Sequence, residues 1–333
     1  MMLWSEKYRP TDFSGILGQE NVVQTLESAA DEGNVPHLLV VGRPGTGKSV
    51  AVEALARRLY GTHWQENTTV FPTADIFEQG RKYLEAEERF AHLYRKDESV
   101  LSNFKHIVKW YAGIRPLDAA FRLVVFEGAA ALTREAQQGL RRLMERYSGT
   151  CRFVFLTTNG SAIIPAIASR CLPLTFGPVP DPLVRQRLEE ILRAEGVPAG
   201  KVSDDDLDLI VPAAAGDLRR AILLLQLSAE SEGHVDLADT AASETENVAA
   251  SAFGALMKGD LVGAKARTEA LLIDYGLTGE EVVRELARAA DRTYNDPRIA
   301  VALADADLLI RRGGSEFIQI NALLARISQE VFS

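Results

Sequence analysis

The chain has 333 residues, of which 47% are hydrophobic and 25% charged, and its formal net charge is −9. This length predicts two or three domains, and no apolar run reaches the roughly 20 residues of a membrane-spanning helix. The acidic balance disfavours nucleic-acid binding over the whole surface, so any such contact needs a local basic patch.

Cysteine usage and the first residues bear on the compartment. Only two cysteines occur, Cys151 and Cys171, and neither lies in a Cys-x-x-Cys or Cys/His spacing. This argues against a disulfide scaffold and a metal cluster, and for a reducing interior. The opening residues, MMLWSEKYRP, hold no apolar segment of a secretory signal. We therefore expect a cytoplasmic protein.

In chain order, the first half alternates short apolar runs with helical patterns. The predicted strands are 37–42 (HLLVVG), 70–72 (VFP), 121–126 (FRLVVF) and 151–158 (CRFVFLTT). Helices are predicted over 50–61, over the highly charged 76–111 and over 134–147. Strands alternating with helices predict an α/β fold with a doubly wound parallel sheet.

The second half contains only helical patterns. They begin after the proline-rich segment 175–182, TFGPVPDP, and a polar break follows at 236–246. Three domains are predicted: an α/β domain over 1–177, a small helical lid over 178–243 and an all-helical C-terminal domain over 244–333.

A phosphate-binding motif follows the first predicted strand. GRPGTGKS matches G-x-x-x-x-G-K-[ST] and comprises Gly42, Arg43, Pro44, Gly45, Thr46, Gly47, Lys48 and Ser49. Its glycines let backbone N–H groups turn toward phosphates at a helix N-terminus. Lys48 is expected to neutralise the β- and γ-phosphates, and Ser49 to ligate Mg²⁺. ATP and Mg²⁺ are therefore the predicted ligands.

The strand at 121–126 ends in an unusual way for a protein that hydrolyses ATP. Such a strand usually ends in two adjacent acids, one for Mg²⁺ and one for the attacking water. Here a single carboxylate, Glu127, is followed by Gly128. Glu127 is expected to face the metal, whereas Gly128 has no group to orient a water, a loss of about 10²–10⁴ in rate. A carboxylate from elsewhere in the chain remains an alternative.

Several further motifs occur in a fixed order along nearly the whole chain. They are SEKYRP (5–10), ILGQE (16–20), GNVPHLL (33–39), the P-loop, AQQGLRRLMERYS (136–148), IASRC (167–171), GDLRRAI (216–222) and DYGLTGEEVV (274–283). In this order the chain resembles the small subunits of replication factor C, the AAA+ sliding-clamp loader of archaea and eukaryotes. The resemblance implies an AAA+ P-loop domain, a helical lid and a helical collar domain that holds a ring together.

The resemblance also implies roles for individual residues. Around the adenine it places Tyr8, Arg9, Pro10, Ile16 and Gly18. Asn159 matches sensor 1, which helps to position the water and the γ-phosphate. Arg219 matches sensor 2, and Arg170 matches the arginine finger, which serves the ATP of a neighbouring subunit. Each residue alone has a plainer interpretation: Asn159 as a cap, Arg219 as a solvated side chain and Arg170 as a surface ion pair.

Family members follow DNA with an early helix of the ATPase domain, and here the matching segment is 97–116. The candidates for a DNA contact are Lys105, Lys109 and Arg115. The family tends to be basic where this chain has Ile107 and Gly113, which predicts a weaker contact. A surface helix without a DNA role remains the alternative.

An extra segment of about twenty residues, 74–96, precedes that helix. Its mixed charge predicts a solvated helix, and its function is open.

The resemblance and the residues together predict an ATP-binding clamp-loader subunit that supplies Arg170 in trans and hydrolyses its own ATP weakly or not at all. The expected partners are other small and large subunits, the sliding clamp and primer–template DNA, with no membrane. Two rivals stay open: a competent AAA+ ATPase acting on DNA in another role, and a structural scaffold with a fixed nucleotide.

Overall fold

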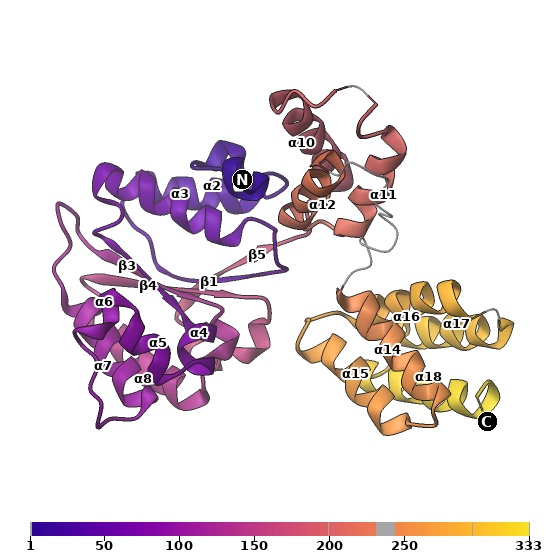
Figure 1. The fold of residues 1–333 in the computed structure, drawn as a ribbon. Coiled ribbons are helices and arrows are strands. Elements are labelled where there is room, and N and C mark those ends of the chain that lie inside the picture. The colour runs from indigo at the N-terminus through magenta and orange to yellow at the C-terminus, as the bar shows by residue number, and fades with distance from the viewer. Residues whose placement is uncertain (1, 199, 231–243, 295, 333) are drawn as a thin grey trace. The chain divides into compact units, whose positions relative to one another are not determined.

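The computed structural model describes residues 2–198, 200–230, 244–294 and 296–332. The chain forms two compact units, residues 1–232 and 233–333 (Figure 1). The first unit has two apolar clusters, one for each face of a central sheet, and the second unit has one of its own. No helix in the described ranges has the length and apolar character to cross a bilayer.

The first unit is built on a five-stranded parallel sheet. Its strands are β1 (His37–Gly42), β2 (Thr68–Pro72), β3 (Arg122–Glu127), β4 (Cys151–Thr157) and β5 (Cys171–Phe176), in the order β2-β3-β4-β1-β5. Every pair is parallel, which confirms the predicted α/β architecture. Because β1 and β3 flank β4, the P-loop after β1 and Glu127 at the end of β3 meet at one edge of the sheet.

The fifth strand was missed by the sequence analysis, which expected four. β5 pairs with β1 alone, so it is an edge strand. Pro173 is tolerated at such an edge, and only three of the six side chains are buried. A short segment that contains proline and alternates irregularly between polar and apolar residues has no strong strand pattern. Residues 171–176 form a strand because they pair with β1.

Helices cover both faces of the sheet (Figure 1). One face carries α2 (Glu20–Asp31) and α3 (Lys48–Tyr60), and the other carries α7 (Val100–Gly113) and α8 (Arg134–Arg146). Short helices complete this part of the chain: α1 (Trp4–Lys7), η1 (Phe13–Gly15), η2 (Gly61–His63), η3 (Ala129–Ala131), η4 (Gly160–Ala162) and α9 (Pro165–Ala168).

The inserted segment 74–96 corrects a prediction. It folds as three short helices, α4 (Thr73–Glu78), α5 (Arg81–Ala86) and α6 (Glu88–Ala91), rather than as one solvated helix. Ile76, Leu84 and Phe90 are at most 1% exposed, and the Phe90 ring stacks on Phe71 with centroids 5.1 Å apart. Each short helix buries one such apolar side chain, so no helical periodicity reveals that the segment belongs to the core.

Helices alone follow the sheet. The described part of the predicted lid holds α10 (Asp181–Ala194), α11 (Asp204–Ala214) and α12 (Leu218–Glu230), all in the first unit. The predicted boundary at 243 lies outside the described residues. The second unit contains α14 (Glu244–Met257), α15 (Leu261–Ile273), α16 (Gly279–Thr293), α17 (Pro297–Arg311) and α18 (Glu316–Glu330).

Candidate nucleotide site and basic groove

The P-loop connects β1 to α3 with a backbone that requires glycine at two points. Gly45 and Gly47 have φ values of +64° and +101°, which side chains disfavour. A Cβ at Gly45 would lie 1.7 Å from Asp217 Oδ1, and the backbone N–H of Leu218 donates to the carbonyl of Gly45 at 3.3 Å. The start of α12 therefore packs directly against the loop.

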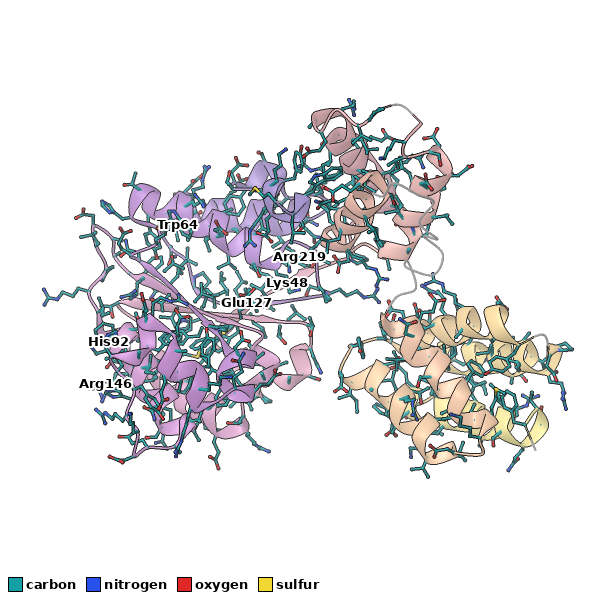
Figure 2. All side chains as sticks on the ribbon, in the orientation of Figure 1. Lys48, Trp64, His92, Glu127, Arg146 and Arg219 are labelled. Carbon is teal, nitrogen blue, oxygen red and sulfur yellow. The ribbon has the colours of Figure 1, made fainter. Side chains whose placement is uncertain are left out.

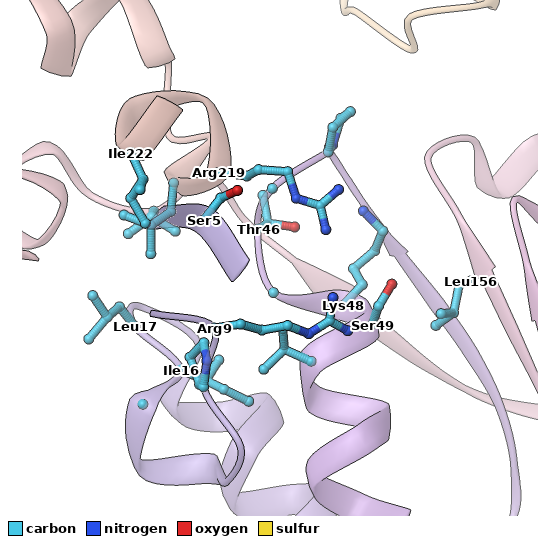
Figure 3. Close-up of a pocket in the computed structure, with 18 of the residues that line it drawn as sticks. Ser5, Arg9, Ile16, Leu17, Thr46, Lys48, Ser49, Leu156, Arg219 and Ile222 are labelled. Carbon is cyan, nitrogen blue, oxygen red and sulfur yellow. The ribbon is translucent and has the colours of Figure 1, made fainter. Parts of the chain in front are cut away.

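A cavity opens above the P-loop (Figure 3). Its walls come from the N-terminal segment, the P-loop, the ends of β3 and β4, and the lid. The lining residues are Ser5, Tyr8, Arg9, Pro10, Gly15, Ile16, Leu17, Pro44, Gly45, Thr46, Gly47, Lys48, Ser49, Val50, Glu127, Gly128, Ala130, Leu156, Thr157, Thr158, Val179, Arg187, Leu218, Arg219 and Ile222. Figure 2 shows Lys48, Glu127 and Arg219 at the same end of the sheet. The cavity therefore combines a polar phosphate end with an apolar pocket.

Lys48 is a partly buried cation at the polar end. Its Nζ donates a hydrogen bond to the carbonyl of Arg43 at 2.6 Å. The pKa of Lys48 is lowered to about 8, mainly by burial and also by the nearby Arg219, while Asp217 and Glu127 act in the opposite direction. An anion at this position would offset the cost of burial, so the cavity suits a phosphate ligand.

Ser49 and Glu127 provide oxygen atoms beside Lys48. The Ser49 hydroxyl donates to Glu127 Oε1 at 2.7 Å. A hydroxyl and a carboxylate are hard donors of the kind Mg²⁺ accepts alongside phosphate and water oxygens. No group of three or more His, Cys, Asp or Glu side chains suited to a metal occurs in the described part of the chain. The two oxygens therefore fit a nucleotide-bound Mg²⁺ rather than a separate metal cage.

The residue after Glu127 contributes no acid. Gly128 has φ +66°, and Thr73 Oγ1 donates to the carbonyls of Glu127 at 2.7 Å and Gly128 at 2.6 Å. A Cβ at Gly128 would lie 3.7 Å from the Ala74 Cβ, an ordinary contact. Among the lining residues Glu127 is the only carboxylate. The described lining of this cavity thus holds one carboxylate, Glu127, and none at position 128.

Arg170 lies outside this cavity, just after α9. Its Nη2 donates to Glu145 Oε1 at 2.8 Å and its Nη1 to the carbonyl of Ala166 at 2.7 Å. The Arg170 side chain is about one-third exposed, which leaves it accessible to another molecule.

A second cavity, which we call the basic groove, lies between α7 and α8. Its lining residues are Lys105, Lys109, Arg134, Glu135, Gln138, Gly139, Arg142, Leu143 and Arg146. Five of these are cations and one is a carboxylate. Arg134, Gln138, Arg142 and Arg146 are four residues apart in turn, so they form one stripe along α8. The groove is the local basic patch that an acidic chain needs for a polyanion.

The basic groove contains part of the predicted DNA surface. Lys105 and Lys109 line it, but Arg115 does not. Ile107 is 1% exposed, so the side chain at this position faces the core. The apolar character of Ile107 therefore does not weaken a surface contact. Gly139 gives room to Lys105, whose Cε would lie 2.8 Å from a Cβ at Gly139.

Comparison with known proteins gives the family. Residues 18–180 match the model of the DNA polymerase III delta subunit, and residues 245–326 match the replication factor C C-terminal domain. The replication factor C small subunit of Archaeoglobus fulgidus is 34% identical over 98% of this chain and 97% of its own length. The replication factor C small subunit of Methanocella arvoryzae is 33% identical over 98% of this chain and 97% of its own length.

The chain belongs to the replication factor C small-subunit family.

Solved structures give the fold of this family member. The match to a RuvB mutant from Thermotoga maritima covers 84% of this chain and 86% of the RuvB chain, with a TM-score of 0.51 and 15% sequence identity. The match to the Aeropyrum pernix ORC1 protein, solved in complex with DNA, covers 97% of this chain and 85% of the ORC1 chain, with a TM-score of 0.50 and 17% sequence identity. Together with the parallel sheet, these neighbours confirm the AAA+ fold.

Some residues that the P-loop motif or the replication factor C resemblance assigned to the nucleotide site do not line the cavity. They are Gly18, Gly42, Arg43 and Asn159. Gly18 packs against the lid, since a Cβ there would lie 2.7 Å from Pro180 Cδ. Asn159 Oδ1 accepts hydrogen bonds from the backbone N–H and hydroxyl of Ser161 at 2.9 and 2.6 Å. Its sensor role stays a prediction.

The structure also adds lining residues that sequence reasoning missed in this replication factor C homologue. Arg187 Nη2 donates to the carbonyl of Tyr8 at 3.3 Å, and Leu218 and Ile222 place apolar side chains of α12 in the cavity. Arg9 Nη2 donates to Glu53 Oε2 of α3 at 3.1 Å, which ties the N-terminal segment to the helix after the P-loop. Of Arg187, Leu218 and Ile222, the last two had a sequence signal, because they belong to the GDLRRAI motif.

The lowered pKa of Lys48 predicts how ATP affinity of this family member depends on pH. Phosphates favour the ammonium form, so binding raises the pKa from its value of about 8 in the free protein. Affinity should be constant below pH 8 and fall up to about tenfold per pH unit above it. Titration with a fluorescent ATP analogue from pH 7 to 9.5 measures this. Lys48→Arg keeps a charge that does not titrate in this range, so an equal slope in that variant would contradict the assignment.

Proposed function

We propose that the chain is an ATP-binding small subunit of a clamp loader that opens the sliding clamp and loads it onto primed DNA. Membership of the family supports the clamp-loading role. The observation that carries the specific proposal is a complete P-loop cavity with Glu127 as the only carboxylate among its lining residues. Such a site holds ATP and lacks the group that activates water.

The nucleotide is held by groups of different kinds. Tyr8, Pro10, Ile16 and Ile222 enclose the base, and the P-loop N–H groups with Lys48 bind the phosphates. Ser49 and Glu127 would hold Mg²⁺, which supplies charge neutralisation to the phosphates when bound. Arg219 enters the cavity from the lid opposite Arg9, as Figure 3 shows, so ATP contacts both parts of the first unit.

In the proposed ring, Arg170 acts on the ATP of a neighbouring subunit with an intact acid pair. Its side chain is partly exposed and lies outside the cavity of its own chain, which supports a role in trans. A positive charge placed against the γ-phosphate stabilises the charge that develops as the phosphoryl group leaves. The helical second unit would form the collar with the other subunits, and the reaction would take place in the cytoplasm.

DNA is proposed to bind in the basic groove through its phosphates. Arg142 and Arg146 lie on the stripe of α8, and Lys105 and Lys109 lie opposite on α7. Contacts of this kind fix position without reading sequence and depend on salt. The groove extends the predicted set, since the cations of α8 were not among the candidates.

A substitution in the groove tests this contact. Arg142→Ala with Arg146→Ala should weaken binding of the assembled complex to primer–template DNA, and lower the slope of log affinity against log salt by about two. Fluorescence anisotropy at several salt concentrations measures both. Arg115→Ala, outside the groove, is the control. An unchanged slope in the double variant would remove the groove from the proposal.

Reconstitution separates the proposal from its rivals. The complex of this chain with its small and large partner subunits should load a labelled clamp onto primed circular DNA, and Lys48→Ala in this chain should slow loading. A competent ATPase with another role predicts DNA-stimulated hydrolysis by the purified chain alone. A scaffold predicts that Lys48→Ala disturbs assembly while assembled complexes load at the normal rate. Either result would replace the proposal.

A further inference from the structure

The predicted finger is already paired within its own chain. Arg170 Nη2 lies 2.8 Å from Glu145 Oε1, near the C-terminal end of α8, and Nη1 lies 2.7 Å from the carbonyl of Ala166. A second cation of the same helix, Arg141, lies 3.8 Å from the same carboxylate oxygen. The guanidinium therefore faces an anion before any neighbouring subunit is present.

The pair is not needed to hold the local backbone. The N–H of Arg170 donates to the carbonyl of Ile167 at 2.9 Å, and the N–H of Ser169 donates to that of Pro165 at 2.9 Å. These bonds already fix the turn that ends α9. Both partners of the ion pair are partly exposed, with side chains 36% and 48% accessible. An exposed ion pair of this kind favours the paired state by a factor of about five at most.

We propose that Glu145 is a positioning residue that keeps Arg170 neutralised until the ATP of a neighbouring subunit displaces it. The inference depends on the proposed role of Arg170 in trans. A carboxylate at hydrogen-bond distance cancels the positive charge that a finger must offer to the transition state. A triphosphate carries more negative charge than one carboxylate, so the ATP of a neighbour competes with Glu145 for the guanidinium, and the ion pair slows engagement of the finger. Because the pair is exposed and weak, the exchange is readily reversible.

Glu145 thus limits engagement of the finger in an incompletely assembled ring. The paired state should dominate when the neighbouring site is empty or holds a nucleotide without a γ-phosphate. Removing the carboxylate charge should increase the fraction of free finger by the same factor of about five at most.

The test uses the assembled complex and measures single-turnover ATP hydrolysis without DNA. Glu145→Gln should raise the rate two- to fivefold, and the rise should vanish when Arg170→Ala is added. Glu85→Gln, an exposed acid on α5, is the matched control and should change nothing. A merely structural role for Glu145 would instead lower the thermal unfolding midpoint and the rate together.

The outcomes distinguish the inference from the function on which it depends. If Arg170→Ala lowers hydrolysis while Glu145→Gln leaves it unchanged or lowers it, the inference is overturned and the finger remains. If Arg170→Ala leaves hydrolysis intact, the finger role itself fails. A rise in Glu145→Gln that persists in the double variant also overturns the inference, because the effect then does not pass through Arg170.

Discussion

Replacing Arg170 with alanine should slow ATP hydrolysis about 10³-fold or more in the assembled complex. The affected site is the one on the neighbouring subunit that this chain completes with its arginine. The guanidinium stabilises charge that exists only in the transition state, so its loss affects the rate far more than nucleotide binding. Arg170 is outside the cavity of its own chain, so binding of ATP by this chain should not change. Single-turnover hydrolysis and equilibrium binding measure the two effects separately.

Two controls sharpen that result. Arg170→Lys keeps the charge but not the forked geometry, so it should recover only part of the rate. Arg141→Ala removes the other cation near Glu145 and leaves the finger in place. Full hydrolysis by the Arg170→Ala complex would show that the finger was wrongly assigned.

Restoring an acid after Glu127 is expected to have the second-largest effect. Gly128→Glu should raise hydrolysis at this chain's own site by about 10²-fold, at the lower end of what a general base contributes. The full 10⁴-fold contribution of a general base is not expected. Gly128 has φ +66°, and a residue with a side chain is less stable in this backbone conformation by about 1 kcal/mol or more. Space is available, since the nearest side-chain atoms to a Cβ there are 3.7 Å away.

Gly128→Gln is the matched variant, because it has the same backbone strain and nearly the same shape without the carboxylate. The measurement needs a complex in which only this chain binds ATP, which alanine in place of the P-loop lysine of each partner provides. If the glutamate and glutamine variants hydrolyse ATP at the same rate, the missing acid is not what limits this site.

Local motifs made the phosphate end of the site predictable. The P-loop, with Lys48 and Ser49 at the start of the next helix, follows one strongly apolar strand, and Glu127 ends another. A parallel sheet brings the carboxyl ends of its strands to one edge. The contact between Ser49 and Glu127 therefore follows from two short segments and the sheet order.

The remaining walls depend on contacts between distant segments. Arg187 reaches Tyr8 across 179 positions of sequence, and no local pattern reports such a pairing. The buried side chains of 74–96 were hidden because three short helices share no common period. The stripe of α8 differs, since Arg134, Arg142 and Arg146 are readable from the sequence at spacings of eight and four.

The most direct test of the account uses the complex in which this chain alone can bind ATP. Radiolabelled ATP is added at saturation, and bound ATP and ADP are followed in a single turnover with clamp and primed DNA present. We expect one ATP per chain to remain bound and uncleaved long after the unmodified complex has turned over. Conversion of that ATP to ADP at the rate of the intact sites would contradict the central claim that the chain holds ATP without cleaving it.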